Sequence, residues 1–315
     1  MFNILVTGVG SVIGYGIIDG LKRSSLQLNV TGIDIYDDAY GGFIADEFVQ
    51  DIRADKPGFI ANINSIIRSH NIDLVMPGIE ADLYQLWEHR DCIAAPVVLG
   101  NPLCMALSQD KRLTYDYLHQ FDIDLIPTLY DCDFSVCEKE LGIPFLFKPV
   151  MSSASKGIEK IYTEDEFSFF TRRSKGRCIY QRIVGCPEEE FTCALFGDGK
   201  GGFFDHIILR RKLSGDGSTN KATLDEDEKV LAYIQKLCAI LKPEGPLNIQ
   251  IRKEGDRVYL LEINCRVSSS CSIRTMMGYN EPEMCVRYFL LHEQPCPGKR
   301  KAKKAVRYIA DFIIE

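Results

Sequence analysis

The sequence predicts an α/β region with a parallel sheet at the N-terminus, followed by an α+β region. Two observations lead to this prediction. Over the first hundred residues, short apolar runs alternate with amphipathic stretches, which is typical of strands joined by helices. From about Ser108 this alternation gives way to successive strands around a few helices. A chain of 315 residues is also long enough for two or three domains.

In the first region we expect a Rossmann-like domain over residues 1–106. Strands are expected over residues 3–7, 30–35, 74–77 and 97–100, and helices over residues 15–23 and 62–70. A glycine-rich turn, residues 8–14, follows the first strand, and Asp34 ends the second. This pattern also suits an NAD(P)-dependent short-chain dehydrogenase or epimerase. However, the glycine spacing departs from that fingerprint, and none of the 14 tyrosines has a lysine four residues later. A tight strand-to-helix turn is the favoured interpretation.

In the second region, the expected helices cover residues 110–120 and 226–241. The expected strands cover residues 145–148, 178–184, 191–196, 203–209, 248–252, 258–263 and 305–309. A small-residue loop, 152–157, follows Lys148 and Pro149. It offers almost no apolar area to bury, so we expect it to be mobile until a ligand orders it.

Composition limits the classes of function. The hydrophobic content of 46% and charged content of 26% are ordinary for a globular protein. A net charge of -7 gives no basic footprint, so we expect no nucleic-acid partner. The N-terminal segment predicts a buried strand rather than a signal peptide, and no apolar run is long enough to predict a membrane span. The 12 cysteines lack C-x-x-C spacing and are expected to be reduced thiols in a cytoplasmic enzyme.

The most informative segment is a predicted hairpin over residues 247–266. Gln250 lies on its first strand, and Glu262 and Asn264 lie two residues apart on its second. Alternation places Glu262 and Asn264 on one face, and their hard oxygen atoms suit Mg²⁺. Arg266 continues that face and could reach phosphates. The alternative is a solvent-facing hairpin with a polar outer face.

This N-x-Q and E-x-N-x-R pattern resembles the metal-binding end of the ATP-grasp superfamily. The resemblance is strongest to the carbamoyl phosphate synthase large-chain branch and extends to small amino-acid ligases such as the pyrrolysine-pathway ligase. Further segments resemble the family in the same order along the chain: residues 108–111, 144–149, 152–158 and 180–192. The resemblance implies two ATP-grasp lobes, over residues 107–184 and 185–315, with ATP between them.

The resemblance also implies a role for each of these segments. Lys111 and Lys148 would face the α- and β-phosphates, although a lysine taken alone is most often a surface residue. The loop that closes over the phosphates would contribute Ser153, Ser155, Lys156 and Gly157. The hinge that contacts adenine would contribute Gln181, Arg182, Ile183 and Val184. Glu190 would accept hydrogen bonds from the ribose. Gln181 replaces the family's usual acid, and three successive glutamates, Glu188, Glu189 and Glu190, leave the ribose ligand open.

A basic strand end offers candidates for binding the γ-phosphate or a substrate carboxylate. Because neighbouring strand residues alternate sides, Arg210 and Arg211 cannot both face the site. An exposed basic strand end is the alternative for this segment. With Arg266, these arginines complete the candidate catalytic set.

The resemblance implies an ATP-dependent ligase that uses Mg²⁺. It would phosphorylate a small carboxylate substrate to an acylphosphate and couple it to an amine or similar nucleophile. A non-catalytic ATP-binding protein with the same fold is the alternative. The sequence names neither the carboxylate nor the nucleophile, and a homodimer is compatible with it.

Overall fold

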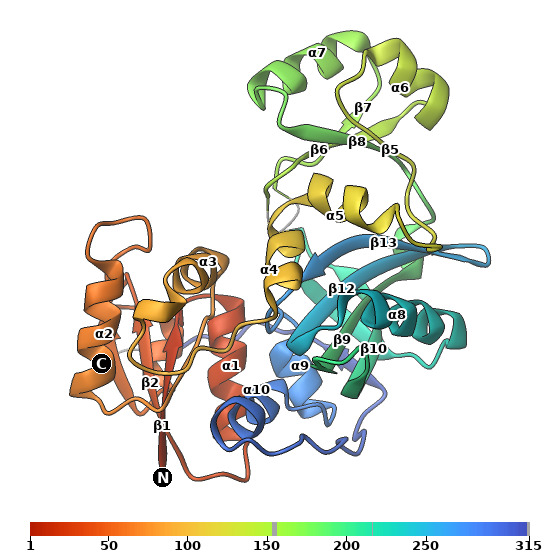
Figure 1. Cartoon of the computed structure of the whole chain (residues 1–315). Helices are drawn as coiled ribbons and strands as arrows, with labels where there is room; N and C mark the ends of the chain where they lie inside the picture. Colours follow the sequence, from red (N-terminus) through yellow and green to blue (C-terminus); the bar gives the residue numbers. More distant parts are fainter. Residues whose placement is uncertain (153–155, 216, 314–315) are drawn as a thin grey trace.

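The computed structural model describes residues 1–152, 156–215 and 217–313, and its named strands form three sheets. In Figure 1 the N-terminal sheet lies beside a six-stranded sheet, and a small four-stranded sheet lies above the latter. The part of the chain around the six-stranded sheet is called the large lobe below, and the part around β5–β8 the small lobe. The strands are β1 (Phe2–Thr7), β2 (Leu28–Asp34), β3 (Glu47–Gln50), β4 (Leu74–Met76), β5 (Thr128–Leu129), β6 (Phe145–Pro149), β7 (Glu159–Ile161), β8 (Cys178–Arg182), β9 (Glu190–Asp198), β10 (Phe203–Leu213), β11 (Thr219–Leu224), β12 (Glu244–Glu254), β13 (Arg257–Asn264) and β14 (Lys304–Val306).

Helices connect and cover these sheets. They are α1 (Val12–Lys22), α2 (Phe59–Ser69), α3 (Glu80–Glu88), α4 (Pro102–Gln109), α5 (Lys111–Leu118), α6 (Phe134–Leu141), α7 (Glu164–Arg173), α8 (Glu228–Leu241), α9 (Cys271–Met276) and α10 (Glu281–Cys285). Short turns of other helix types are η1 (Tyr40–Phe43), η2 (Arg90–Cys92), η3 (Pro187–Glu189) and the π-helix η4 (Val286–Leu290). Among the described residues, no helix is long and apolar enough to cross a membrane.

The N-terminal sheet is parallel, as predicted, with the strand order β3-β2-β1-β4. The strand expected at residues 97–100 is wrong. Val97 makes only an isolated bridge to Val75, because the chain turns away at once toward α4. Helix α1 begins at Ser11, whose side chain accepts a hydrogen bond from the Gly14 amide and caps the helix.

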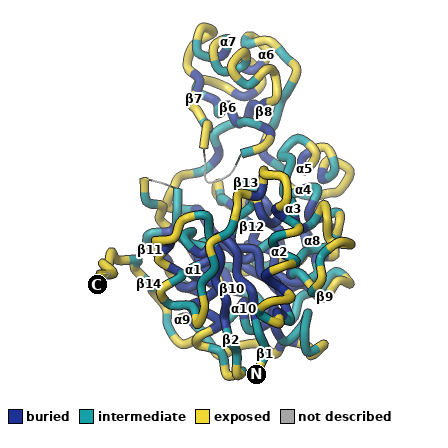
Figure 2. Tube along the Cα trace, turned by 90° about the vertical axis from the view of Figure 1, so that its left-hand side faces the viewer, coloured by how far each residue is buried: buried dark blue, intermediate teal, exposed yellow. Residues whose placement is uncertain are grey.

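The six-stranded sheet has the order β13-β12-β9-β10-β11-β14, and all of its pairs are antiparallel. Helix α8 packs on one face through buried side chains such as Ile234 and Leu237. The opposite face contributes Ala194, Phe196 and Leu209 to a core that also contains residues of α1 and the N-terminal strands. The large lobe and the N-terminal part therefore share a core, which is the dark interior in Figure 2.

Helix α1 lies directly against α9 and α10. A Cβ atom added to Gly20 would come within 2.6 Å of the Pro282 side chain, and one at Gly16 would come within 3.0 Å of Cys271. The Asn280 side-chain amide also donates a hydrogen bond of 2.9 Å to the Gly20 carbonyl. Only glycine allows this close approach of the two ends of the chain.

The small lobe has the strand order β5-β8-β6-β7, with α6 and α7 on one face. Phe145, Phe167 and Tyr180 pack edge to face or tilted in its core. Helix α4 crosses residue 106, where we expected the first domain boundary, and contributes Cys104 and Met105 to the core around α8. The domain limits therefore remain predictions.

Candidate functional site

Strands β12 and β13 place the predicted metal ligands opposite one another. Gln250 pairs in register with Glu262, and Asn248 pairs with Asn264. Cross-strand neighbours of this kind have Cβ atoms about 5 Å apart. Asn248 is 1% exposed and Asn264 5%, so this face is not the solvent-facing surface of the alternative interpretation.

Glu262 has a carboxylate that is free to bind a ligand. Among the described residues no group donates a hydrogen bond to it, and its nearest charged partner is the Lys111 ammonium at 4.0 Å. By contrast, the Gln250 carbonyl oxygen accepts from Arg211 at 2.8 Å, and the Asn264 oxygen accepts from Arg266 at 3.1 Å. Of the three predicted metal ligands, Glu262 is thus the one whose side-chain oxygen atoms accept no hydrogen bond from the described residues.

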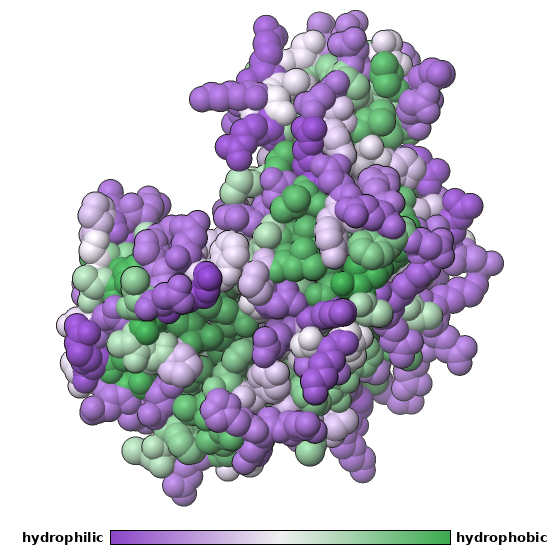
Figure 3. Space-filling model, in the orientation of Figure 1, coloured by the Kyte–Doolittle hydropathy of each residue, from purple (hydrophilic) through white to green (hydrophobic). Residues whose placement is uncertain are grey.

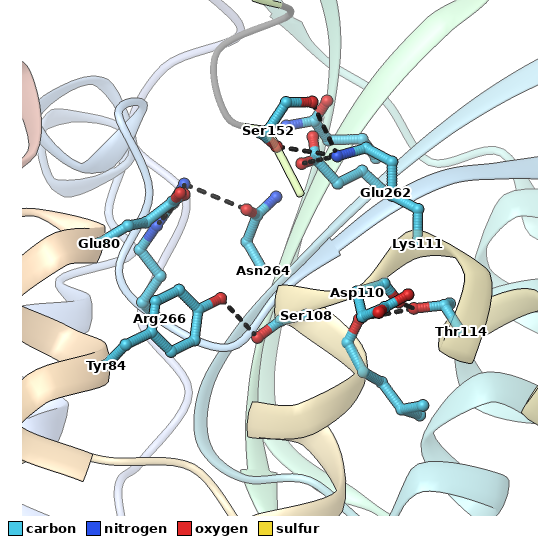
Figure 4. A network of polar contacts seen from close by, with 12 residues as sticks. Glu80, Tyr84, Ser108, Asp110, Lys111, Thr114, Ser152, Glu262, Asn264 and Arg266 are labelled. Carbon is cyan, nitrogen blue, oxygen red and sulfur yellow. Dashed lines mark hydrogen bonds and ion pairs between the residues drawn. The ribbon is translucent and has the colours of Figure 1, made fainter. Parts of the chain in front are cut away.

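Lys111 begins helix α5, which Asp110 caps by accepting from the Leu113 amide. The Lys111 ammonium donates to the Ser152 carbonyl oxygen at 2.8 Å and lies 3.2 Å from the Ser152 hydroxyl. Figure 4 shows Lys111, Ser152 and Glu262 pointing toward one another from three different segments. Lys111 is therefore not an ordinary surface lysine.

Lys148, near the end of β6, is buried with 5% of its surface exposed. Burial lowers the pKa of Lys148 to about 8, and Glu262 opposes this shift while Lys111 adds to it. A lysine held in this way has few protein partners for its charge. Anionic ligand atoms would stabilise its protonated form.

Glu190 is the buried member of the three successive glutamates. One of its oxygens accepts from Arg211 at 2.8 and 3.0 Å, and the other accepts from Arg252 at 2.5 Å. Burial alone would raise the pKa of Glu190, but these two guanidinium groups hold it below its ordinary value. Glu188 is exposed, and Glu189 pairs with Arg210. The ribose assignment of Glu190 remains a prediction.

The two candidate arginines of β10 lie on opposite faces. Arg211 is 6% exposed and bridges Glu190 and Gln250, whereas Arg210 points outward to Glu189 and Asp225. Arg211 therefore belongs to the cluster around Glu262, and Arg210 does not. Arg252 was missed in the sequence, although it lies two residues after Gln250 on the same strand face.

Arg266 connects the end of β13 to the N-terminal part of the molecule. Its guanidinium donates to Glu80 in the first turn of α3 at 2.6 Å, and both side chains are largely buried. One turn along α3, the Tyr84 hydroxyl lies 3.3 Å from the Ser108 hydroxyl. Figure 4 shows these residues facing one another across the gap between α3 and α4. No sequence motif had singled out Glu80.

The side chains of the predicted hinge residues, 181–184, point in different directions. Gln181 is fully buried; its amide nitrogen donates to the Thr128 hydroxyl at 2.8 Å, while its oxygen has no partner among the described residues. The Arg182 side chain reaches Glu254 at 2.8 Å. The Val184 side chain is buried in a small core, and Ile183 is half-buried. The adenine assignment of this segment remains a prediction.

The predicted closing loop lies partly outside the described residues, which leave out Ser153 and Ser155. Lys156 and Gly157 are described and are exposed. Gly157 has a φ of 73°, in the left-handed region that glycine adopts without strain. Figure 3 shows the surface falling back between the N-terminal part and the small lobe.

A buried arginine, Arg274, holds the side chain of Asn248 on strand β12. Arg274 is fully buried and donates to the Asn248 oxygen at 2.6 Å, the Thr192 hydroxyl at 2.8 Å and the Ser268 hydroxyl at 2.7 Å. Glu281 balances its charge at 3.9 Å, and burial raises the pKa of Glu281 to about 7 despite this arginine. Sequence analysis missed both residues, because neither belongs to a recognisable pattern.

The donor set fits Mg²⁺. The described residues contain no group of three or more His, Cys, Asp and Glu side chains that could enclose a metal without other ligands. Mg²⁺ usually takes only one or two carboxylates and completes its shell with water and substrate phosphates. The unpartnered Glu262 carboxylate, beside the amides of Gln250 and Asn264, provides such a partial shell.

Comparisons with known proteins support one family. Residues 187–312 match the family described as "ATP-grasp in the biosynthetic pathway with Ter operon". The chain is 27% identical over 266 residues to formate-dependent phosphoribosylglycinamide formyltransferase of Shewanella frigidimarina, covering 78% of this chain and 64% of that enzyme. It is also 27% identical over 143 residues to the carbamoyl phosphate synthase large chain of Clostridium botulinum, covering 41% of this chain and 13% of that protein.

The fold is shared with a solved enzyme. The structure of N5-carboxyaminoimidazole synthetase from Staphylococcus aureus, complexed with ADP, superposes with a TM-score of 0.75 at 15% identity, covering 95% of this chain and 80% of that one. An N-terminal parallel sheet followed by antiparallel sheets is the architecture shared with that enzyme. Residues 187–312 thus match an ATP-grasp family, and most of the chain is similar in sequence or in fold to the enzymes named above.

Proposed function

We propose that this enzyme uses ATP and Mg²⁺ to phosphorylate a small carboxylate and then couples the acylphosphate to an amine or similar nucleophile. One observation carries the proposal. Lys111 from α5, Lys148 from β6 and Glu262 from β13 converge from three segments, with Lys111 and Glu262 4.0 Å apart and Lys148 buried beside them. Two cations and one unpartnered carboxylate are the groups needed around a metal-bound triphosphate.

The basic and acidic side chains of this cluster would have different roles. Lys148 and Lys111 would hold the phosphates through charge-assisted hydrogen bonds. Glu262, with Gln250 and Asn264 beside it, would hold Mg²⁺, which when bound neutralises charge on the phosphates. Glu190 accepts a hydrogen bond from Arg211, which would meet the γ-phosphate or the substrate carboxylate.

The reaction requires no nucleophile from the protein. A substrate carboxylate oxygen attacks the γ-phosphorus of ATP, the bond to the β-phosphate oxygen breaks, and ADP leaves. The amine then attacks the carbonyl carbon, inorganic phosphate leaves, and the amine loses a proton to give an amide-type bond. Positioning and electrostatic stabilisation supply most of the rate in such phosphoryl transfers.

The test is a turnover screen. Purified protein is incubated with Mg-ATP and pools of carboxylates, with and without amino acids, and ADP release is measured. Hydroxylamine added in place of the amine should trap the acylphosphate as a hydroxamate. We expect substrate-dependent ADP release in at least one pool, and a loss of about 100-fold in the Glu262→Gln variant.

The control variant is Glu226→Gln, which changes an exposed glutamate of the same lobe and should keep full turnover. If ATP binds in a Mg²⁺-dependent way but no pool stimulates ADP release, the ligase proposal fails. The non-catalytic ATP-binding alternative would then hold.

A further inference from the structure

A cavity in the N-terminal part lies away from the cluster around Glu262. It has a volume of about 480 Å³ and opens at the carboxyl ends of the parallel strands β1, β2 and β3. Its lining includes Gly10, Asp34, Asp51, Ile52, Ile79 and Asp82. The strand order β3-β2-β1-β4 places this cavity where successive connections leave the sheet in opposite directions from β1. In open parallel sheets, ligands bind at this kind of position.

The first turn of α3 separates the cavity from the ATP-grasp cleft. Glu80 points to Arg266 at the end of β13, whereas Asp82, two residues later, lines the cavity. Residues two apart on a helix point about 200° apart, so the two carboxylates face different spaces. A ligand in the cavity would therefore not occupy the site proposed for ATP.

The charges in the cavity exclude an anionic group against this wall. Asp34, Asp51 and Asp82 all line it. Its one lining cation, Arg53, is exposed and pairs with Asp55 at 3.2 Å. Burial raises the pKa of Asp51, and burial together with Asp51 and Asp34 raises the pKa of Asp82 to about 7. A ligand that binds against the three carboxylates should therefore present hydrogen-bond donors to them.

Asp82 is the most incompletely partnered of the three carboxylates. It is only 6% exposed, and the Thr7 side chain is the one hydrogen-bonding neighbour that lowers its pKa. A carboxylate has about four acceptor positions, and one hydroxyl serves one of them. Asp34, in contrast, accepts from the Gly10 amide at 2.8 Å and the Tyr36 amide at 3.2 Å. A buried acceptor of this kind is costly unless a donor arrives.

The remaining wall is aliphatic. Ile33, Ile35, Ile52 and Ile79 line the cavity together with two alanines. Such a wall binds the face of a ring, and an acid at the end of the second strand suits a pair of sugar hydroxyls. Asp34 lies in that position, 24 residues after Gly10 of the glycine turn. The shape and chemistry match a neutral ring that carries both hydroxyl and amine donors.

We propose that this cavity binds the nucleoside part of a second ligand, with its hydroxyls toward Asp34 and a further donor toward Asp82. The site is separate from the proposed ATP cleft and does not depend on turnover there.

Calorimetric titration with adenosine tests the proposal. The protein is first saturated with Mg²⁺ and a non-hydrolysable ATP analogue, so that the cleft between the lobes is filled. We expect adenosine to bind at one remaining site, with the same affinity in the Glu262→Gln variant. Asp34→Asn and Asp82→Asn should each weaken binding at least 10-fold, whereas Asp91→Asn, at an exposed residue outside the cavity lining, should not change it.

A further variant tests the cavity without changing a buried side chain, in case Asp34→Asn or Asp82→Asn unfolds the protein. Ile52 is 39% exposed at the mouth, so Ile52→Trp should block the cavity while the melting temperature stays near that of the parent. Adenosine binding that the ATP analogue abolishes, or that Ile52→Trp leaves intact, would overturn the proposal. So would the absence of adenosine binding at millimolar concentration. Binding of agmatine but not adenosine would show a simple cation site instead.

Discussion

Lys148 is a buried base whose proton depends on its surroundings. Its pKa of about 8 lies below the ordinary lysine value because burial disfavours the charged form. Phosphates nearby would favour the charged form and raise this pKa again. We therefore expect nucleotide binding to take up roughly half a proton at pH 8 and less at pH 7, and affinity to fall as the pH rises above 8.

Calorimetry of ATP-analogue binding in buffers of different ionisation enthalpy measures this proton uptake directly. Lys148→Arg provides the control, because a guanidinium stays charged throughout this range and should remove the pH dependence. A parent protein whose binding heat is independent of the buffer at pH 8 would contradict the assignment of Lys148 to the phosphates.

Single residues also show what sequence patterns can and cannot locate. Alternation along β13 was enough to place Glu262 and Asn264 on one face, because a strand's side-chain period is fixed. Their pairing with Gln250 and Asn248 is seen only in the structure. The same rule applied to β12 would have found Arg252. Glu80 and Arg274 could not be found in this way, since each meets its partners through tertiary contacts, 186 residues apart for Glu80 and Arg266.

At the scale of an element, strand β10 places the neighbouring residues Arg210 and Arg211 on opposite faces, so we expect their substitutions to have different effects. Arg211→Met should leave the buried Glu190 with one cation instead of two, so we expect a loss of about 3 kcal/mol in unfolding free energy and a large loss of turnover. Arg210→Met removes only exposed ion pairs and should cost less than about 1 kcal/mol.

Urea denaturation and ADP release, measured on both variants, give the comparison. Equal effects of the two substitutions would show that the alternation of side chains along β10 does not decide which arginine serves the site.

Helices and strands with long hydrophobic patterns were predicted well from the sequence, and those with short patterns were predicted poorly. The strands that became β9, β10, β12 and β13 carry long apolar alternation and were expected from the sequence. β11 was missed because its sequence has only two apolar residues, Ala222 and Leu224, and its pairing to β10 is irregular near Lys212. Helix α3 was missed because its low hydrophobicity and short length resemble a loop.

At the scale of the whole molecule, the Glu80–Arg266 ion pair joins the N-terminal part to the end of β13. Glu80→Gln should lower turnover roughly 10-fold, because the Arg266 side chain loses its anchor, while ATP affinity stays within about 2-fold since Lys111 and Lys148 are untouched. A double-mutant cycle with Arg266→Met should give a coupling of about 1–2 kcal/mol in activation free energy.

The matched control is Glu88→Gln, which changes an exposed glutamate at the other end of α3. Additive effects of the Glu80 and Arg266 substitutions would mean that the two residues act independently, and the contact would then have no role in catalysis.

The close packing of α1 on α9 and α10 has a consequence for synthesis on the ribosome. The glycine face of α1 is made first, but Cys271 and Pro282, which cover it, are made about 250 residues later. At roughly 5–20 residues per second, the partner of that face is made about 13–50 s later. During this interval the nascent chain presents an apolar helix surface that chaperones can hold, and the first domain reaches its final packing only when the last helices emerge.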